Sequence, residues 1–446
     1  MKSWAAFVTA GIVLAALAGW PAFVAERSAS ADESGAAPAV AATLTPAPVT
    51  PDYVQRDHNV AFYERAVHRS PHDQIIARLL AGQYLMRFRE RGDIGDLRRA
   101  RLAAQRSLSI QPHENGGAEG ELASVALALH QFRDARRYDG DVVRMQPWSS
   151  SAVAALASTD MELGDYARAA TLLARPPSPY LDASWESTVA RYEEVTGHLS
   201  AARVRLARGM QQVDSVFDNP AEARAWYHFR AGELAFEAGD LSPAERDFKD
   251  AIAIFPSDAK AYNSLARIYC AEHRWRDALT AATHGAALVP LPETLGYQAD
   301  AQRALGDREG SRETADLIGA IERIGNSYGV NDRAIAVYES EHRVHLHDAL
   351  TIAKRDAAAR DDLFAEDTLA WALAMNGEWE SARPHAERAI ATGIEDSRIQ
   401  FHAGVIALKT GHVAEARDRL QQALVANPYF HPVYADEARR LLGSMR

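Results

Sequence analysis

Three histidines lie close together in the sequence, where they could bind a metal ion. His342 and His345 are three residues apart and would share one helix face, with His347, Glu341 and Asp348 beside them. Imidazole and carboxylate groups bind zinc, so a metal-dependent enzyme is one function that this cluster permits. A structural zinc site needs four convergent ligands, however, and the segment falls in a turn just before a predicted helix. Solvated turn residues explain the same pattern, and we expect no metal site.

No other residue pattern in the chain indicates catalysis. The sequence lacks the glycine-rich phosphate loops, the Gly-x-Ser-x-Gly nucleophile turn, the His-Glu-x-x-His zinc motif and the acidic EF-hand loop. The single cysteine, Cys270, can form no internal disulfide and lies in an apolar helical pattern, where a buried thiol is expected. We therefore predict a non-catalytic protein without a cofactor.

A repeat of 34 residues organises most of the chain. A glycine is followed two residues later by a bulky apolar residue, and three residues after that by alanine. The glycines are Gly164, Gly197, Gly239, Gly377 and Gly411, and His130 and His273 take their place in two further units. The alanines are 34 residues apart from Ala135 to Ala169, from Ala244 to Ala278, and from Ala382 to Ala416. This period is typical of helix–turn–helix units, because glycine permits a positive φ in the turn and small residues let the two helices approach.

From about Ile75 to the C-terminus, the chain resembles bacterial tetratricopeptide repeat (TPR) proteins. The residues that carry the resemblance are Asp367-Thr-Leu-Ala-Trp371-Ala-Leu-Ala, Gly377, His402-Ala-Gly404 and Asn427-Pro428, which are similar to the last two repeats of a largely uncharacterised exported branch. The resemblance implies an all-α fold, a right-handed superhelical solenoid of TPR helix–turn–helix repeats, and no particular reaction. We expect about nine helical pairs within residues 56–446, with a lone helix before them and a capping helix at the C-terminus.

The concave face of such a superhelix is formed by the first helix of each pair. Unit positions two, five and nine share this face, and they predict a partner-binding groove lined by Trp226, Phe229, Glu233, Lys260, Asn263, Arg267, Trp371 and Phe401. Lys, Asn and Arg together suit a peptide carboxylate, and aromatic side chains are frequent anchors in protein interfaces. A groove of ordinary solvated residues would show the same types, and Trp226 and Phe229 would also suit a seam between repeats.

The N-terminal 31 residues predict an export signal. Lys2 precedes an uncharged apolar run over residues 3–25, and Ala29-Ser30-Ala31 is a cleavage site of the small-x-small type. The run is also long enough to span a bilayer, so an uncleaved membrane anchor is the alternative. Residues 32–55 are rich in Ala and Pro, and they predict a disordered linker. We therefore expect a periplasmic or secreted protein, or one tethered to the cytoplasmic membrane through residues 3–25.

The chain is acidic, with 49 Lys and Arg residues against 60 Asp and Glu residues and a net charge of −11 at pH 7. Nucleic-acid binding needs clustered positive charge, so we expect no nucleic-acid partner. The repeats and the export signal favour a scaffold that holds a protein or peptide partner on its concave face. Two alternatives stay open: a ligand-binding protein, and a metal-dependent enzyme that uses His342, His345 and His347.

Overall fold

The computed structural model describes residues 51–216, 218–328 and 333–445, and within these residues it is all-α, with no β-strand. Helix α1 (Arg56–Arg69) belongs to no pair and packs on the first pair, ten packed pairs follow, and α22 (Tyr434–Ser444) ends the array. The pairs are α2 (Gln74–Arg91) with α3 (Ile94–Ile110), α4 (Gly116–Ala128) with α5 (Phe132–Met145), α6 (Ser150–Glu162) with α7 (Tyr166–Leu173), α8 (Ala183–Val195) with α9 (Leu199–Ser215), α10 (Ala221–Glu237) with α11 (Leu241–Ile254), α12 (Ala259–Ala271) with α13 (Trp275–Leu288), α14 (Pro292–Ala304) with α15 (Arg308–Tyr328), α16 (Arg333–His342) with α17 (Leu346–Ala359), α18 (Leu363–Met375) with α19 (Trp379–Ile390), and α20 (Ser397–Lys409) with α21 (Val413–Ala426). The predicted solenoid is confirmed, with ten described pairs against the nine or so expected.

Short-range signals explain where these helices begin and where the turns fall. The side chains of Asp258, Asp362 and Asp396 accept hydrogen bonds from main-chain N–H groups in the first turns of α12, α18 and α20. The five glycines that the repeat predicts to have positive φ all do, with values from 74° to 84°. His130 and His273 adopt the same left-handed conformation at φ 56°, which is unfavourable for a residue with a Cβ atom.

Small residues bring the two helices of a pair together, as the repeat predicts. The alanines Ala244, Ala278, Ala382 and Ala416 are all 0% exposed. A Cβ atom on Gly232 of α10 would lie 2.6 Å from the ring of Phe248 in α11, so no larger residue fits there without a shift. Buried apolar clusters therefore recur along the array, as expected for stacked repeats.

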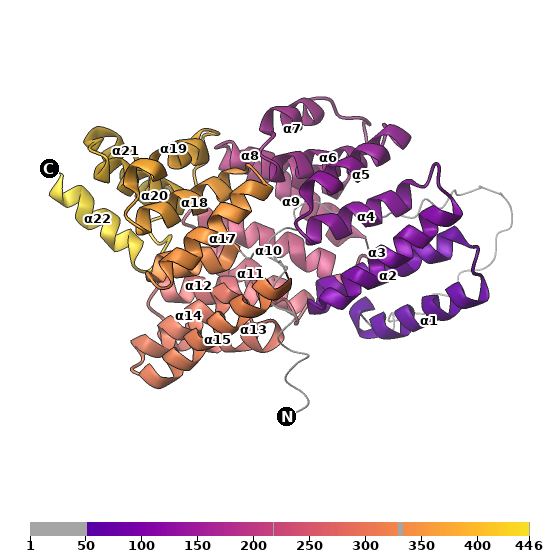
Figure 1. Cartoon of the computed structure of the whole chain (residues 1–446), viewed down its shortest axis with the longest axis horizontal. Helices are drawn as coiled ribbons and strands as arrows, with labels where there is room; N and C mark the ends of the chain where they lie inside the picture. The colour runs from indigo at the N-terminus through magenta and orange to yellow at the C-terminus, as the bar shows by residue number, and fades with distance from the viewer. Residues whose placement is uncertain (1–50, 217, 329–332, 446) are drawn as a thin grey trace, which may run out of the picture.

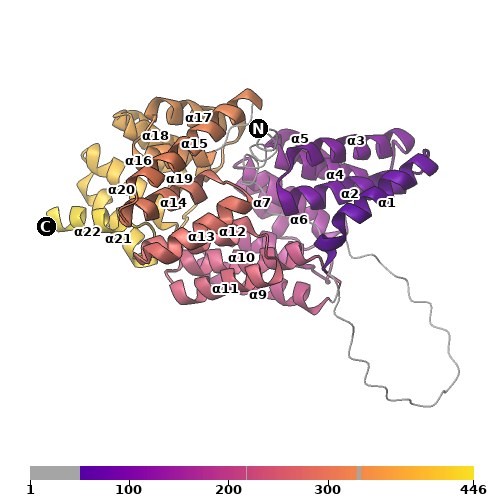
Figure 2. The same ribbon diagram turned by 90° about the horizontal axis from the view of Figure 1, so that it is seen from below.

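The superhelix completes more than one turn, and its successive turns touch. The main-chain N–H of Leu363, at the start of α18, donates a hydrogen bond of 3.0 Å to the hydroxyl of Tyr166, which follows α6. Asn427, just before α22, donates a bond of 2.6 Å to the main-chain carbonyl of Phe236 in α10. Each contact joins one pair, α6/α7 or α10/α11, to the segment that follows the next five pairs, and Figure 1 accordingly shows α18 beside α8. The N-terminal helices α1–α5 and the C-terminal helices α20–α22 lie at opposite ends of the molecule (Figure 2).

Residues 51–55, predicted to end a disordered linker, belong to the folded array. They include the 3-10 helix η1 (Asp52–Gln55), whose Tyr53 ring packs edge-on against Phe255 at 5.2 Å. The side chain of Asp52 accepts a hydrogen bond of 3.0 Å from the main-chain N–H of Ala221 at the start of α10. The linker boundary at residue 55 is therefore wrong, because Asp52 and Tyr53 bind residues far along the chain that composition does not reveal.

Residues 1–50 lie outside the described residues, and with them the predicted signal or membrane anchor and the rest of the predicted linker. Within the part of the chain that the structure does describe, none of the helices combines the length and the apolar character needed to cross a bilayer.

Candidate functional site

The first helices of the pairs from α8 to α20 carry a set of mostly polar side chains that contact one another across neighbouring pairs, and we call this surface the inner wall. It is lined by Arg191 and Glu194 of α8, Trp226, Phe229, Arg230, Glu233 and Glu237 of α10, Lys260, Asn263 and Arg267 of α12, Glu293 and Tyr297 of α14, Arg333 and Glu341 of α16, and Arg398 of α20. Ion pairs of 2.6 Å between Arg230 and Glu194, and of 2.7 Å between Arg267 and Glu233, join adjacent pairs. Six of the eight predicted groove residues lie on this wall.

Three of these six residues share one pocket, which we call the anchor pocket. Trp226 and Phe229 of α10 and Lys260 of α12 line it, together with Arg89, Glu222 and Asp258. It has about 460 Å³ of empty space, part of which is open to solvent. Trp226 also lines an adjoining pocket that faces α8. Both aromatic side chains are half-buried, so part of each ring remains available to a partner.

Lys260 is a cation of the anchor pocket, and its nearby charges are the carboxylates of Asp258 and Glu222. Among the residues the structure describes, its ammonium group donates no hydrogen bond. Burial lowers the pKa of Lys260, although the carboxylates of Asp258 and Glu222 oppose this shift. Burial also raises the pKa of Asp258 to about 6. The pocket therefore holds a half-buried cation that can donate hydrogen bonds to a bound group.

The other predicted polar residues already bind one another or a neighbouring helix. Glu233 accepts hydrogen bonds of 2.7 Å from Arg267 and 2.6 Å from Ser264. Burial by itself would raise the pKa of Glu233, but Arg267 and Ser264 lower it overall. Asn263 accepts a hydrogen bond of 3.0 Å from the hydroxyl of Thr294 in α14. These contacts hold neighbouring first helices in place. They also leave fewer polar side chains of the inner wall free to bind a partner than the sequence predicted.

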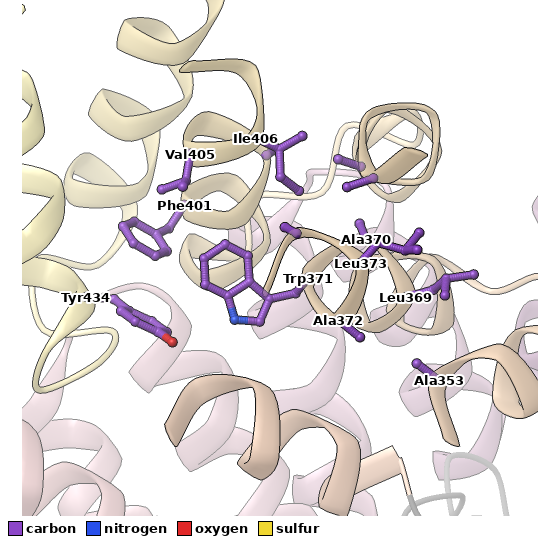
Figure 3. Close-up of a cluster of buried hydrophobic side chains, with 14 of the residues drawn as sticks. Ala353, Leu369, Ala370, Trp371, Ala372, Leu373, Phe401, Val405, Ile406 and Tyr434 are labelled. Carbon is purple, nitrogen blue, oxygen red and sulfur yellow. The ribbon is translucent and has the colours of Figure 1, made fainter. Parts of the chain in front are cut away.

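Trp371 and Phe401 are core residues, and their predicted place in the groove is wrong. Their exposed fractions are 4% and 0%. Figure 3 shows Trp371 directed toward Phe401 and Tyr434, and the ring centroids of Phe401 and Tyr434 are 4.7 Å apart in a stacked arrangement. The capping helix α22, which carries Tyr434, packs in one buried cluster with Trp371 and Phe401 and covers the faces that the next repeat would cover in a longer array. The position of Trp371 and Phe401 within their repeats did not predict that the terminal helices would bury them.

The three histidines near residue 345 do not converge. His342 lies 3.1 Å from Asp300 and 2.9 Å from the carbonyl of Tyr338, whereas His345 lies 3.1 Å from Glu339. His347 is exposed. Within the described ranges, no group of three or more His, Cys, Asp or Glu side chains is placed to hold a metal ion.

A buried arginine closes the contact between successive turns, and the sequence analysis did not predict it. Arg360, just before α18, binds Glu162 of α6 at 3.0 Å, Asp356 at 3.1 Å and Asp362 at 3.1 Å. Its side chain is 0% exposed. Burial alone would lower the pKa of Arg360, but these three carboxylates together raise it. We call this cluster, with the Tyr166–Leu363 hydrogen bond, the inter-turn joint.

Within the part of the chain that the structure describes, ten helix pairs define the molecule as a helical-repeat solenoid of the TPR type. No protein-family model matches the chain, and no curated protein matches it. Among solved structures, it is similar to a human IFIT1 dimer with PPP-AAAA, at 15% identity and a TM-score of 0.49 over 72% of this chain and 73% of that one. A human IFIT1 dimer with m7Gppp-AAAA gives 15% identity and 0.49 over 75% and 76%, and yeast Tom70 gives 11% and 0.32 over 84% and 96%. The fold assignment rests on the helix pairs themselves.

Proposed function

We propose that this chain is a non-catalytic scaffold that binds a protein or peptide partner along its inner wall. The observation that carries the proposal is the anchor pocket, where the unpaired ammonium group of Lys260 lies beside the half-buried rings of Trp226 and Phe229. Lys260 is half-buried, and a partner that supplies a carbonyl or carboxylate oxygen would accept a charge-assisted hydrogen bond from its ammonium group. Aromatic side chains in a partly desolvated pocket are the usual anchors of protein interfaces.

The charge of the inner wall favours a peptide over a nucleic acid. Arg230 and Arg267 are already paired with Glu194 and Glu233, so they offer little uncompensated positive charge to phosphates. A peptide main chain supplies both donors and acceptors, which suits a wall on which cations and carboxylates alternate. We therefore expect no saturable binding of a single-stranded RNA oligonucleotide at physiological salt, which a fluorescence anisotropy titration measures.

The proposed place of action is outside the cytoplasmic membrane. This part of the proposal rests on residues 1–31, whose sequence has the layout of an export signal. Cell fractionation followed by N-terminal sequencing of the mature chain tests it. A protein that stays in the cytoplasm with Met1 intact would contradict this location without affecting the proposed binding surface.

Matched variants test the binding surface. The full-length protein and its Trp226→Ala and Lys260→Ala variants are crosslinked in envelope extracts, and captured proteins are quantified. The control is Trp148→Ala, because Trp148 is 66% exposed in the segment between α5 and α6 and does not line the anchor pocket. We expect the two inner-wall variants to lose at least about tenfold of a specific partner, since anchor residues contribute about 2 kcal/mol or more. Equal capture by all four proteins would refute the role of this pocket.

A further inference from the structure

Helices α3 and α5, the second helices of the first two pairs, present one continuous surface to solvent. Leu97 and Ala104 of α3 belong to a buried cluster against which Tyr138 of α5 also packs, so the two helices bury their inner sides together. Arg101 of α3 donates a hydrogen bond of 2.7 Å to the side chain of Gln131, directly before α5. The two helices accordingly lie side by side along one edge of the molecule in Figure 2. We call their solvent-facing side the arginine face.

The arginine face is basic although the chain as a whole is acidic. Helices α3 and α5 carry eight arginines against four aspartates, a net charge of +4, whereas the chain has a net charge of −11. Two of the aspartates, Asp96 and Asp139, are only 1% and 4% exposed, which leaves Asp134 and Asp141 as the carboxylates near the surface. In α11 and α15, second helices further along the chain, carboxylates outnumber cations. The basic charge is therefore specific to this part of the array.

Half of these arginines are exposed and form no ion pair with any residue that the structure describes. They are Arg98 and Arg106 of α3 and Arg133 and Arg137 of α5. Arg106 donates a hydrogen bond of 3.0 Å to the carbonyl of Pro71, and the guanidinium of Arg137 lies 4.1 Å from the ring centroid of Tyr138. Neither contact neutralises the charge, so all four guanidinium groups are available to an external anion such as a phosphate.

Two large apolar side chains are exposed beside these charges. Leu102 lies one helical turn from both Arg98 and Arg106 and is 58% exposed, and Trp148, three residues after α5, is 66% exposed. Arginines attract any polyanion, but Leu and Trp among them are typical of surfaces that enter the headgroup region of a membrane, where apolar groups leave water and Trp is favoured. The phosphate backbone of a nucleic acid would instead place charged groups over Leu102.

We propose that the arginine face binds the surface of a membrane that contains anionic phospholipids. The guanidinium groups contact the headgroup phosphates, and Leu102 and Trp148 lie among the headgroups. The proposed place of action agrees with this role, because an export signal or anchor in residues 1–31 brings the array to the outer side of the cytoplasmic membrane. The arginine face lies on second helices and the inner wall on first helices, so the membrane and a protein partner do not compete for the same residues.

Vesicle co-sedimentation of a chain that comprises residues 32–446 tests the proposal. This chain keeps every described residue and lacks the apolar run of residues 3–25, which would bind lipid by itself. Vesicles of phosphatidylglycerol mixed with phosphatidylcholine are compared with vesicles of phosphatidylcholine alone. We expect binding to the mixed vesicles to be at least about tenfold tighter, and to weaken as the salt concentration rises. Equal binding to both kinds of vesicle, or binding to neither, would overturn the proposal.

A matched pair of double variants locates the binding surface. Arg98→Glu with Arg133→Glu reverses two charges of the arginine face, and Arg276→Glu with Arg312→Glu makes the same change on α13 and α15. All four arginines are exposed and have no ion pair with a described residue, so both variants should keep the fold, which circular dichroism checks. We expect the first variant to bind the mixed vesicles about tenfold or more weakly than the parent chain, and the second to bind like the parent.

Two results would show that the arginine face does not bind membranes. One is the same vesicle affinity for both double variants, because the basic surface would then have no special role. The other is saturable binding of a single-stranded RNA oligonucleotide that Arg98→Glu with Arg133→Glu abolishes, without binding to the mixed vesicles; this outcome would assign the face to nucleic acid. Neither result bears on capture of a partner by the inner wall, because the residues of the two surfaces are different.

Discussion

Replacing Gly164, in the loop between α6 and α7, with alanine should push apart the two successive turns of the superhelix. Gly164 and Gly377 occupy the same position of their repeats, with φ values of 74° and 83°. A Cβ atom on Gly164 would lie 2.2 Å from the carbonyl oxygen of Asp361 in the next turn, and one on Gly197 would lie 2.2 Å from the carbonyl oxygen of Gly393. A Cβ atom on Gly377 would meet nothing within 4 Å.

The expected magnitudes follow from these two environments. Alanine in the left-handed conformation costs about 1–2 kcal/mol at either position. At Gly164 the turns must also move apart by about 1 Å to restore ordinary van der Waals contact, which adds about 1–3 kcal/mol of the kind seen when a packed interior is overfilled. We therefore expect Gly164→Ala to lower the free energy of unfolding by about 2–5 kcal/mol, and Gly377→Ala to lower it by about 1–2 kcal/mol.

Urea unfolding followed by circular dichroism gives this comparison. Repeat arrays can unfold in parts, so the midpoints of the same transition should be compared at a common slope. Gly197→Ala should behave like Gly164→Ala, and Gly411→Ala, where a Cβ atom also meets nothing, should behave like Gly377→Ala. Equal destabilisation by all four substitutions would show that the turns do not touch in solution.

Three further substitutions have definite expected outcomes. His273→Gly should raise the midpoint of thermal unfolding and stabilise the protein by about 1 kcal/mol, because His273 is exposed and glycine relieves its positive φ of 56°. Glu121 is buried, and burial raises its pKa from 4.5 to about 8, so the stability that its protonated form provides below pH 4.5 is lost as the pH rises through 8. Glu121→Gln should leave the free energy of unfolding near pH 4 unchanged and increase it at pH 9 by on the order of 3 kcal/mol relative to the wild-type protein, as urea unfolding at the two pH values would show. An equal loss of stability between pH 4 and pH 9 in the wild-type protein and in the variant would contradict this. Phe401→Ala should cost about 3–5 kcal/mol in urea unfolding, because Phe401 is fully buried. If Phe401→Ala instead weakened partner capture without lowering stability, its assignment to the core would be wrong.

The sequence by itself determined the repeating unit. The positive φ of Gly164 and Gly377, and the burial of Ala244 and Ala416, follow from spacings within one pair. Such features depend on neighbours within a few tens of residues, because a turn between two helices needs a left-handed residue and a close crossing needs a small one. They recur with the same physical cause in every unit, so the pattern was sufficient to predict the fold class.

The candidate site could be predicted only in part. Unit positions predicted a groove that includes Trp226, Phe229 and Lys260, and these three residues line one pocket because they lie on adjacent first helices of regular repeats. The same positions failed at Trp371 and Phe401, where the packing of the terminal helices, and not the spacing, decides which faces are covered.

Only the tertiary structure decided how the solenoid closes on itself. Arg360 and Glu162 are separated by 198 positions, and no local pattern marks them as partners. Their contact depends on the small rotation between each pair and the next, summed over six pairs, so slight differences in packing at every step decide whether the turns meet. This accumulated rotation determines which side chains face one another across the inner wall. The spacing of residues along the chain does not specify it.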